Sequence, residues 1–117
     1  MNLRIEALEE VTYLMPEGRL DFNAAPGFQA EIDRILSGGK LAGALIIDGA
    51  GLEYVSSAGL RVFLLAARAA QRSGIAFALC ALRPPIREVF DLSGFSQIIT
   101  IHPDRETARA QSRTPRK

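Results

Sequence analysis

The sequence predicts an α/β fold with a mainly parallel sheet. Short apolar runs alternate along the chain with segments of helical periodicity, which is typical of strands joined by right-handed helical crossovers. Two of the runs, residues 41–48 and 75–80, are almost continuously apolar, as is usual for strands buried on both faces. Two β-rich runs precede the first helical segment, so we expect the sheet to have an antiparallel edge.

The amino-terminal segment has the pattern of a hairpin. Residues 3–8 alternate apolar and polar side chains, as a half-buried strand does. Residues 11–16 form a second β-rich run, and a turn is expected at residues 9–10 between the two. After a break at residues 17–18, a short strand resumes at residues 19–21.

The first helical segment follows Asn23. Asn is a preferred N-cap, and Pro26 lies early enough in the helix to be tolerated. Four apolar side chains fall on one face at helical spacing: Phe28, Ile32, Ile35 and Leu36. The sequence Ser37-Gly38-Gly39 ends the helix before the buried strand at residues 41–48.

A second helix follows the pair Ser56-Ser57 and ends at Gly74. Its inner face is expected to hold Leu60, Phe63, Leu64 and Ala67. A stripe that lies away from this face consists of Arg61, Leu65, Arg68 and Arg72. The stripe is either a solvated arginine face or a surface that docks a partner, with Leu65 as its apolar centre.

The carboxyl-terminal part of the pattern follows the strand at residues 75–80. Pro84-Pro85 begins a third helix, and its apolar face is expected to hold Ile86, Val89 and Phe90. Ser93-Gly94 ends this helix, and residues 97–101 are expected to form a last short strand.

Length and composition limit the classes of protein that fit. A chain of 117 residues, 48% of them apolar, is expected to form one domain. No apolar run approaches the roughly 20 residues that cross a bilayer, and no signal-peptide core follows Met1. We therefore expect a cytoplasmic protein without membrane insertion. The lone Cys80 and the lone His102 make no metal site, so Cys80 is expected to be a buried, inert thiol and no cofactor is expected.

The charges are distributed unevenly along the chain. Residues 1–103 carry nine basic and eleven acidic side chains, which argues against nucleic-acid binding. Residues 104–117 carry five basic and two acidic side chains and lack apolar spacing. We therefore expect a domain over residues 1–103 and a basic, disordered tail over residues 104–117, for which a docking arm is the alternative.

The two adjacent serines allow four interpretations. Either can simply cap the second helix. A nucleophilic serine would need a nearby base, and the sequence offers only His102, Lys40 and Lys117. A nucleotide-binding loop could begin at residues 49–51, but Tyr54 replaces the third glycine of that motif.

Phosphorylation is the fourth interpretation of the serine pair. It needs only a hydroxyl that a kinase can reach at a helix N-terminus, where the helix dipole favours the added negative charge. A partner that packs against the same loop would be repelled by that charge. Phosphorylation there would therefore act as a switch on binding while leaving the fold intact.

Three segments in the right order resemble one family. They are Glu17-Gly18-Arg19-Leu20-Asp21, the stretch Ser56-Ser57-Ala58-Gly59-Leu60-Arg61 after the buried strand, and the helix at residues 84–95. Together they resemble the STAS domain family and, more closely, the bacterial anti-sigma factor antagonists, over residues 3–103. The resemblance implies a four- to five-stranded, mixed and mainly parallel sheet with three to four helices packed largely on one side.

The resemblance also implies a function without catalysis. The unmodified protein would bind an anti-sigma factor, which is usually a serine kinase that uses ATP and magnesium, and would thereby free a sigma factor. The kinase would then phosphorylate a serine at the start of the second helix and release the antagonist. A metal-dependent serine phosphatase would reset the cycle. We expect the protein itself to be a monomer or weak dimer.

The resemblance indicates which residues carry this function. Many antagonists have the phosphoacceptor directly before the glycine, where this sequence has Ala58. Of the two serines, Ser57 lies nearer the start of the second helix, so we expect Ser57 to be phosphorylated, with Ser56 as second choice. The expected partner surface consists of Arg19, Asp21, Asn23, Ser56, Ser57, Arg61 and Leu65. For the first three, helix capping and turn formation are the alternative roles.

Two other functions stay open at this point. One is an unphosphorylated STAS subunit of a lipid-transport or stress-signalling complex. The other is a small nucleotide-binding enzyme that uses Gly49-Ala50-Gly51.

Overall fold

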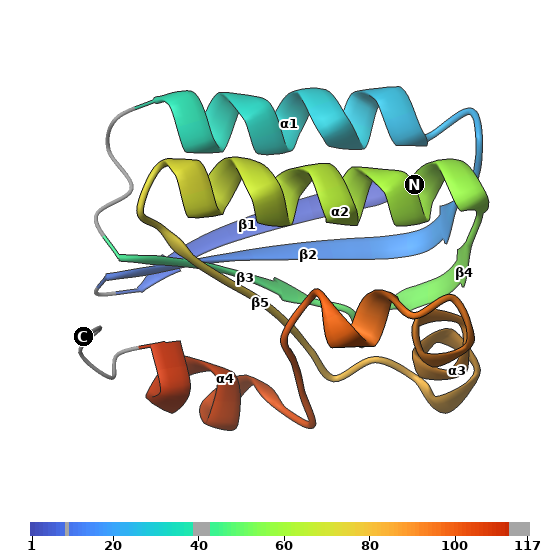
Figure 1. The fold of residues 1–117 in the computed structure, drawn as a ribbon. Coiled ribbons are helices and arrows are strands. Elements are labelled where there is room, and N and C mark those ends of the chain that lie inside the picture. The colour runs from blue at the N-terminus through green and yellow to red at the C-terminus, as the bar shows by residue number, and fades with distance from the viewer. Residues whose placement is uncertain (9, 39–42, 113–117) are drawn as a thin grey trace.

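A six-stranded sheet lies at the centre of the fold in the computed structural model, which describes residues 1–8, 10–38 and 43–112 (Figure 1). Its strands are β1 (Asn2–Leu8), β2 (Val11–Leu20), β3 (Ala44–Asp48), β4 (Leu52–Val55), β5 (Ala76–Cys80) and β6 (Ile101–His102). The α-helices of the described residues are α1 (Ala25–Ser37), α2 (Ser57–Arg72), α3 (Pro84–Leu92) and α4 (Arg105–Ser112). A 3₁₀ helix, η1 (Phe95–Gln97), follows α3.

The strand order is β1-β2-β3-β5-β6. β1 pairs antiparallel with β2, whereas β3, β5 and β6 continue the sheet with parallel pairing. The first four residues of β2 pair with β3, and its last three residues pair with β4. The prediction of an α/β fold with a mainly parallel sheet and an antiparallel edge is thus confirmed, with six strands instead of four or five.

Helices α1, α2 and α3 pack on one face of the sheet. The ring of Phe63 on α2 lies 5.5 Å from the ring of Phe28 on α1 and 5.5 Å from the ring of Phe90 on α3. All three rings are buried, and the burial of each stabilises the fold by about 1.5–3 kcal/mol. This aromatic contact therefore joins the three helices into one core over the sheet.

The buried face of α2 differs from the predicted one. Among the predicted inner residues, Phe63 is fully buried, but Leu60, Leu64 and Ala67 are only half-buried. The buried residues of this helix are Gly59, Val62, Phe63, Ala66 and Ala70. The small residues at 59, 66 and 70 let the helix approach the sheet closely. The face with these small residues is therefore buried, and the face with the larger Leu60 and Leu64 is only half-buried.

The expectation of a disordered tail from residue 104 onward is wrong for residues 105–112. These residues form α4, which packs on the sheet face opposite α1 and α2 (Figure 1). Ala108 is fully buried there in a second core with Tyr13, Ile46 and Cys80. Small alanines give a weak apolar signal in the sequence, although they suffice for close packing on a sheet. Residues 113–117 of the expected tail lie outside the described residues.

Three strand predictions also need correction. β2 runs without a break from Val11 to Leu20, because Gly18 takes φ +101° and absorbs the irregularity as a bulge. No strand was predicted at residues 52–55, where the structure has β4. Residues 95–97 form η1, and the last strand is only Ile101–His102. The part of the expected strand at residues 41–42 lies outside the described residues.

Candidate functional site

The first turn of α2 lies where the ends of β2 and β4 meet. Leu20 at the end of β2 pairs with Val55 at the end of β4. The N–H of Ser56 donates to the carbonyl of Leu20 over 2.9 Å, and the helix begins with the next residue. The strand ends therefore place the two serines beside the segment that follows Leu20.

Ser56 is the N-cap of α2. Its Oγ accepts a hydrogen bond of 3.1 Å from the N–H of Gly59, and its carbonyl accepts one of 2.9 Å from the N–H of Leu60. The side chain of Ser56 is half-buried. The capping interpretation is thus confirmed for this serine, and its hydroxyl already has a role in the fold.

Ser57 has a different environment. It is the first residue of α2 and is exposed, and its hydroxyl has no hydrogen-bond partner within residues 1–8, 10–38 and 43–112. Arg61 follows one helical turn later, on the same face, and is also exposed. An incoming enzyme or partner can reach the Ser57 hydroxyl without disturbing a contact of the fold.

Gly59 explains how α2 comes so close to the strand ends. A Cβ atom at this position would lie 2.8 Å from Leu20 Cγ, 2.9 Å from the Leu20 carbonyl oxygen and 2.9 Å from Val55 Cγ2. Backbone atoms do not yield as a flexible side chain can. The glycine is therefore required by close packing of the helix on β2 and β4, which is what positions the serines.

Arg19 and Tyr54 form a second part of the surface. Arg19 Cζ lies 4.2 Å from the centroid of the Tyr54 ring, a cation–π contact between neighbouring strands β2 and β4. Both side chains are exposed. The contact holds an arginine and an aromatic ring in a fixed arrangement next to the start of α2.

The connection from β2 to α1 is the third part. The carboxylate of Asp21 accepts a hydrogen bond of 2.9 Å from the N–H of Ala24, so Asp21 and not Asn23 caps this turn. The expected capping by Asn23 is wrong, because the N-cap position belongs to Ala24. Asn23 is exposed, and Phe22 beside it is 76% exposed.

The predicted stripe on α2 faces outward. Arg61, Arg68 and Arg72 are exposed and Leu65 is half-buried. Ser57 lies four residues before Arg61 and heads the same stripe. The hydrogen bond from the Ser56 N–H to the Leu20 carbonyl joins the start of α2 to the segment Arg19 to Asn23. The serines and Arg61 therefore lie at the same end of α2 as this segment, and Leu65 lies farther along the helix.

Sequence reasoning missed two residues of this region, Phe22 and Tyr54. An aromatic residue between Asp21 and Asn23 in a predicted turn was a usable signal for Phe22. Tyr54 could not be found in this way, because its contact with Arg19 depends on the pairing of β4 with β2, and no strand was predicted at β4.

The loop at Gly49-Ala50-Gly51 has no free array of amides for a phosphate. The N–H of Gly49 donates to the Cys80 carbonyl over 2.9 Å, and the N–H of Ala50 donates to Asp48 Oδ1 over 3.0 Å. The N–H of Leu52 donates to the Gly49 carbonyl over 3.0 Å. A nucleotide phosphate would have to break these bonds, which argues against the nucleotide-binding enzyme.

The described residues were also compared with the requirements of a metal site, a reactive thiol and a membrane-spanning helix. They contain no group of three His, Cys, Asp or Glu side chains placed to hold a metal ion. Cys80 is fully buried, and burial raises the pKa of its thiol to about 12, with a further contribution from the Asp48 carboxylate. In the same residues, no helix has the length and apolar character needed to cross a membrane.

Comparisons with known proteins agree on one family. The sequence profile of the STAS domain matches residues 2–108. BtrV of Bordetella bronchiseptica, which is named as a candidate anti-sigma factor antagonist, is 32% identical over 114 residues, or 97% of each chain.

Solved structures share the fold. A candidate anti-sigma factor antagonist from Thermotoga maritima has a TM-score of 0.87 and 22% identity, over 95% of this chain and 94% of that one. The anti-sigma factor antagonist SpoIIAA in its unphosphorylated form has a TM-score of 0.81 and 20% identity, over 99% of this chain and all of that one. The phosphorylated form of SpoIIAA from Bacillus has a TM-score of 0.72 and 22% identity, over 96% and 100%. With a profile match over most of its length and a nearly full-length relative, this chain belongs to the STAS domain family.

Proposed function

We propose that this protein is an anti-sigma factor antagonist. Its unmodified form binds an anti-sigma factor through the surface formed by the segment Arg19 to Asn23, Ser57, Arg61 and Leu65. The anti-sigma factor is also a serine kinase, and its phosphorylation of Ser57 ends the binding. A metal-dependent serine phosphatase restores the unmodified form. The protein contributes no catalytic group to this cycle.

The observation that carries the proposal is the difference between the two serines. Ser56 is half-buried and its hydroxyl accepts from the N–H of Gly59, whereas Ser57 is exposed and its hydroxyl has no partner within the described residues. A kinase needs an accessible hydroxyl, so the geometry supports Ser57 over Ser56. The names of BtrV and SpoIIAA, and the existence of a phosphorylated form of SpoIIAA, support the antagonist role.

The position of Ser57 suits a switch on binding. A phosphate there would carry about −1.5 to −2 charges at pH 7. At the N-terminus of α2 the helix dipole and the exposed Arg61 would tolerate that charge within the domain. A partner packed against the same surface would have to bury the phosphate, and desolvation and charge repulsion would oppose that contact. Phosphorylation therefore weakens binding without unfolding the protein.

Mass spectrometry tests the proposal directly. The protein is isolated from growing cells, its intact mass is measured, and the peptide that covers residues 53–68 is mapped. We expect one added phosphate, on Ser57. An unmodified serine pair under all growth conditions would contradict the switch and favour a subunit that binds constitutively.

Variants separate phosphorylation from binding. We expect Ser57→Asp to weaken binding of the co-purified anti-sigma factor at least about tenfold, which corresponds to roughly 1.4 kcal/mol. Ser57→Ala should bind as the unmodified protein does and resist release by ATP. The matched control is Glu53→Gln, an exposed change on β4 that adds no negative charge. Equal binding by Ser57→Asp and the unmodified protein would overturn the assignment of Ser57.

The alternative STAS subunit of a lipid-transport or stress-signalling complex would be recognised by its partner. A small ATP-binding kinase recovered with the protein supports the antagonist, and a transporter ATPase supports the alternative.

A further inference from the structure

The outer edge of β5 is only partly covered. β6 pairs with Leu79 and Cys80, the last two residues of the strand. The chain before β6 forms η1 instead of a longer strand. Along the first three residues of β5, Ala76–Ala78, no strand from the described parts of the chain lies on the outer side.

The uncovered edge presents backbone hydrogen-bonding groups. The N–H of Ala76 donates inward to the Gly43 carbonyl, and the N–H of Leu79 donates outward to the Thr100 carbonyl. Backbone groups alternate in direction along a strand, so the N–H and C=O of Phe77 point outward, as those of Leu79 do. Phe77 therefore continues the hydrogen-bonding row that β6 occupies, at a place where that row has no protein partner in the described residues.

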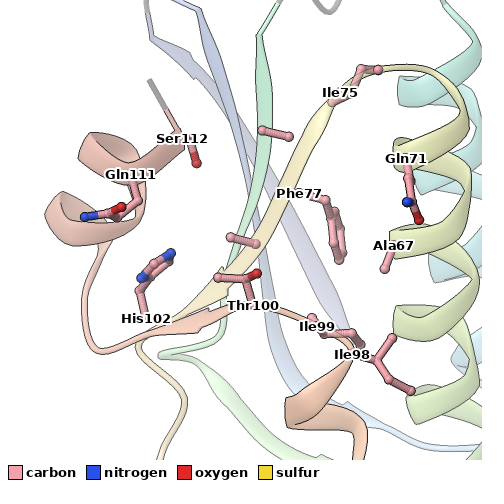
Figure 2. Close-up of a pocket in the computed structure, with 13 residues that line it drawn as sticks. Ala67, Gln71, Ile75, Phe77, Ile98, Ile99, Thr100, His102, Gln111 and Ser112 are labelled. Carbon is pink, nitrogen blue, oxygen red and sulfur yellow. The ribbon is translucent and has the colours of Figure 1, made fainter. Parts of the chain in front are cut away.

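A groove of about 940 Å³ lies along this edge. The five consecutive residues from Gly74 to Ala78 line it. Figure 2 shows β5 running between α2 on one side and α4 on the other, with Ile98 and Ile99 at one end. The two helices make the groove a slot that is open along the strand.

No Asp, Glu, Lys or Arg lines the slot, and His102 is its one titratable side chain among the described residues. Natural sheets commonly protect an edge strand with charges that oppose pairing. The opposite edge of this sheet, β1, has such protection in Arg4 and Glu6, which form ion pairs with Glu17 and Arg105. The edge of β5 is thus the unprotected one.

The two walls of the slot differ in polarity. On the α2 side, Phe77 of β5 and Ala67 of α2 are apolar and Gln71 of α2 is polar, whereas Gln111 and Ser112 on the α4 side are both polar (Figure 2). Successive side chains of an added strand would point to opposite walls. The chemistry that fits is an uncharged, extended segment in which apolar and small polar side chains alternate.

Two other occupants fit less well. A second copy would have to bring its own β5 within about 4.8 Å, although that strand lies between α2 and α4 in each copy. The segment at residues 113–117 contains three basic residues and Pro115, which has no N–H, and the slot offers no acidic partner.

We propose that the slot beside β5 is a second docking site, in which an extended, uncharged segment of a partner protein adds to the sheet as a strand. The open row at Phe77 supplies the backbone bonds, and the two walls select the side chains. The site lies at the carboxyl-terminal end of α2, whereas Ser57 lies at its amino-terminal end. Residues 57 and 71 are about 21 Å apart along the helix axis, so two partners can bind at once. The proposal does not depend on phosphorylation of Ser57.

Peptide titration of the full chain, followed by amide NMR, tests this site. The probes are acetylated and amidated hexapeptides that alternate Thr with Val, Ile or Leu. For each, two further versions carry N-methyl groups along one backbone edge or the other. We expect shifts confined to residues 74–78 and 98–100, and at least about tenfold slower exchange of the Phe77 amide at saturation. Only one N-methylated version should lose binding, since a strand pairs through one edge.

Two matched variants complete the test. Ile98→Lys places a charge at the end of the slot, where Ile98 is 57% exposed, and should weaken peptide binding about tenfold or more. Ile5→Lys makes the same change on β1, where Ile5 is 46% exposed, and should leave binding unchanged. The proposal is overturned by peptide shifts on β1, by no shift with any probe at millimolar concentration, or by equal loss of binding to both N-methylated versions. Concentration-dependent shifts at residues 74–78 without peptide would assign the slot to a second copy and overturn it too.

Discussion

Two adjacent serines at the start of α2 occupy different helix positions. Ser56 accepts from the N–H of Gly59, whereas Ser57 is exposed. Loss of an N-cap hydroxyl costs about 1 kcal/mol, so Ser56→Ala should lower the free energy of unfolding by about that amount. Ser57→Ala should change it by less than about 0.5 kcal/mol. Urea unfolding of the two variants in parallel gives both values.

This comparison tests whether the Ser57 hydroxyl stabilises the fold or is free to accept a phosphate. If Ser57→Ala proves as destabilising as Ser56→Ala, the Ser57 hydroxyl contributes to the fold and its availability to a kinase is contradicted.

Gly59 is the residue at which packing leaves no room for a side chain. A Cβ there would lie 2.9 Å from the Leu20 carbonyl oxygen, and the backbone cannot easily retreat because Leu20 pairs with Val55. We expect Gly59→Ala to lower the free energy of unfolding by about 1–3 kcal/mol, although alanine is the better helix former. Gly27→Ala on α1 is the control, since a Cβ at Gly27 would meet no atom within 4 Å. Equal stability of the two variants in thermal unfolding would show that α2 can move away from the strands.

At the scale of elements, α4 is held to the sheet by Arg105. The guanidinium donates to Asp48 Oδ2 over 2.9 Å and to Glu6 Oε1 over 2.9 Å, and it lies 4.3 Å from the centroid of the Tyr13 ring. Asp48 uses its other oxygen to accept from the N–H of Ala50. One arginine thus joins a polar helix to β1, β2 and β3.

The thiol of Cys80 can report on this attachment. Cys80 is fully buried in the core that α4 covers. Arg105→Ala should favour the undocked helix by about 1–2 kcal/mol, so alkylation of Cys80 by iodoacetamide should speed up roughly 10-fold. The control is Arg87→Ala, which removes an exposed ion pair with Asp91 on α3. Equal alkylation rates in the two variants would mean that packing of Ala108 alone keeps α4 in place.

At the scale of the whole molecule, two buried groups of the second core, Cys80 and Tyr13, make the free energy of unfolding fall as pH rises through the alkaline range. Burial raises the pKa of the Cys80 thiol to about 12, and burial also raises the pKa of Tyr13. The unfolded chain loses these protons at lower pH than the folded chain does. The stability that each protonated group contributes is therefore fully present below the pKa of that group in the unfolded chain. It is lost as pH rises from there toward the pKa of the group in the folded chain.

We expect the free energy of unfolding to fall between about pH 9 and pH 12, with a slope of up to about 1.4 kcal/mol per pH unit from Cys80. Cys80→Ala should be less stable at neutral pH but should show a shallower slope over this range. Denaturant unfolding at several pH values measures both effects. The same slope in both proteins would mean that Cys80 does not cause the dependence and would leave Tyr13 as its source.

The sequence by itself determined the α/β class, the order of most elements and the start of α2, because hydrophobic periodicity and Pro, Gly and Ser punctuation are local signals. It also indicated the residues around the serines, through their resemblance to a family. Only the tertiary structure decided which serine caps the helix, since both have the same local pattern and the Ser56 N–H bonds to Leu20 on another strand.

Local sequence patterns also could not predict α4, β4 or the slot. α4 consists of polar residues and small alanines, and its docking depends on Arg105 reaching Asp48, 57 positions away in the sequence. β4 has only four residues and is defined by its pairing with β2. The slot exists because β6 covers only two residues of β5. Contacts between distant segments create each of these features, and a pattern of neighbouring residues does not record them.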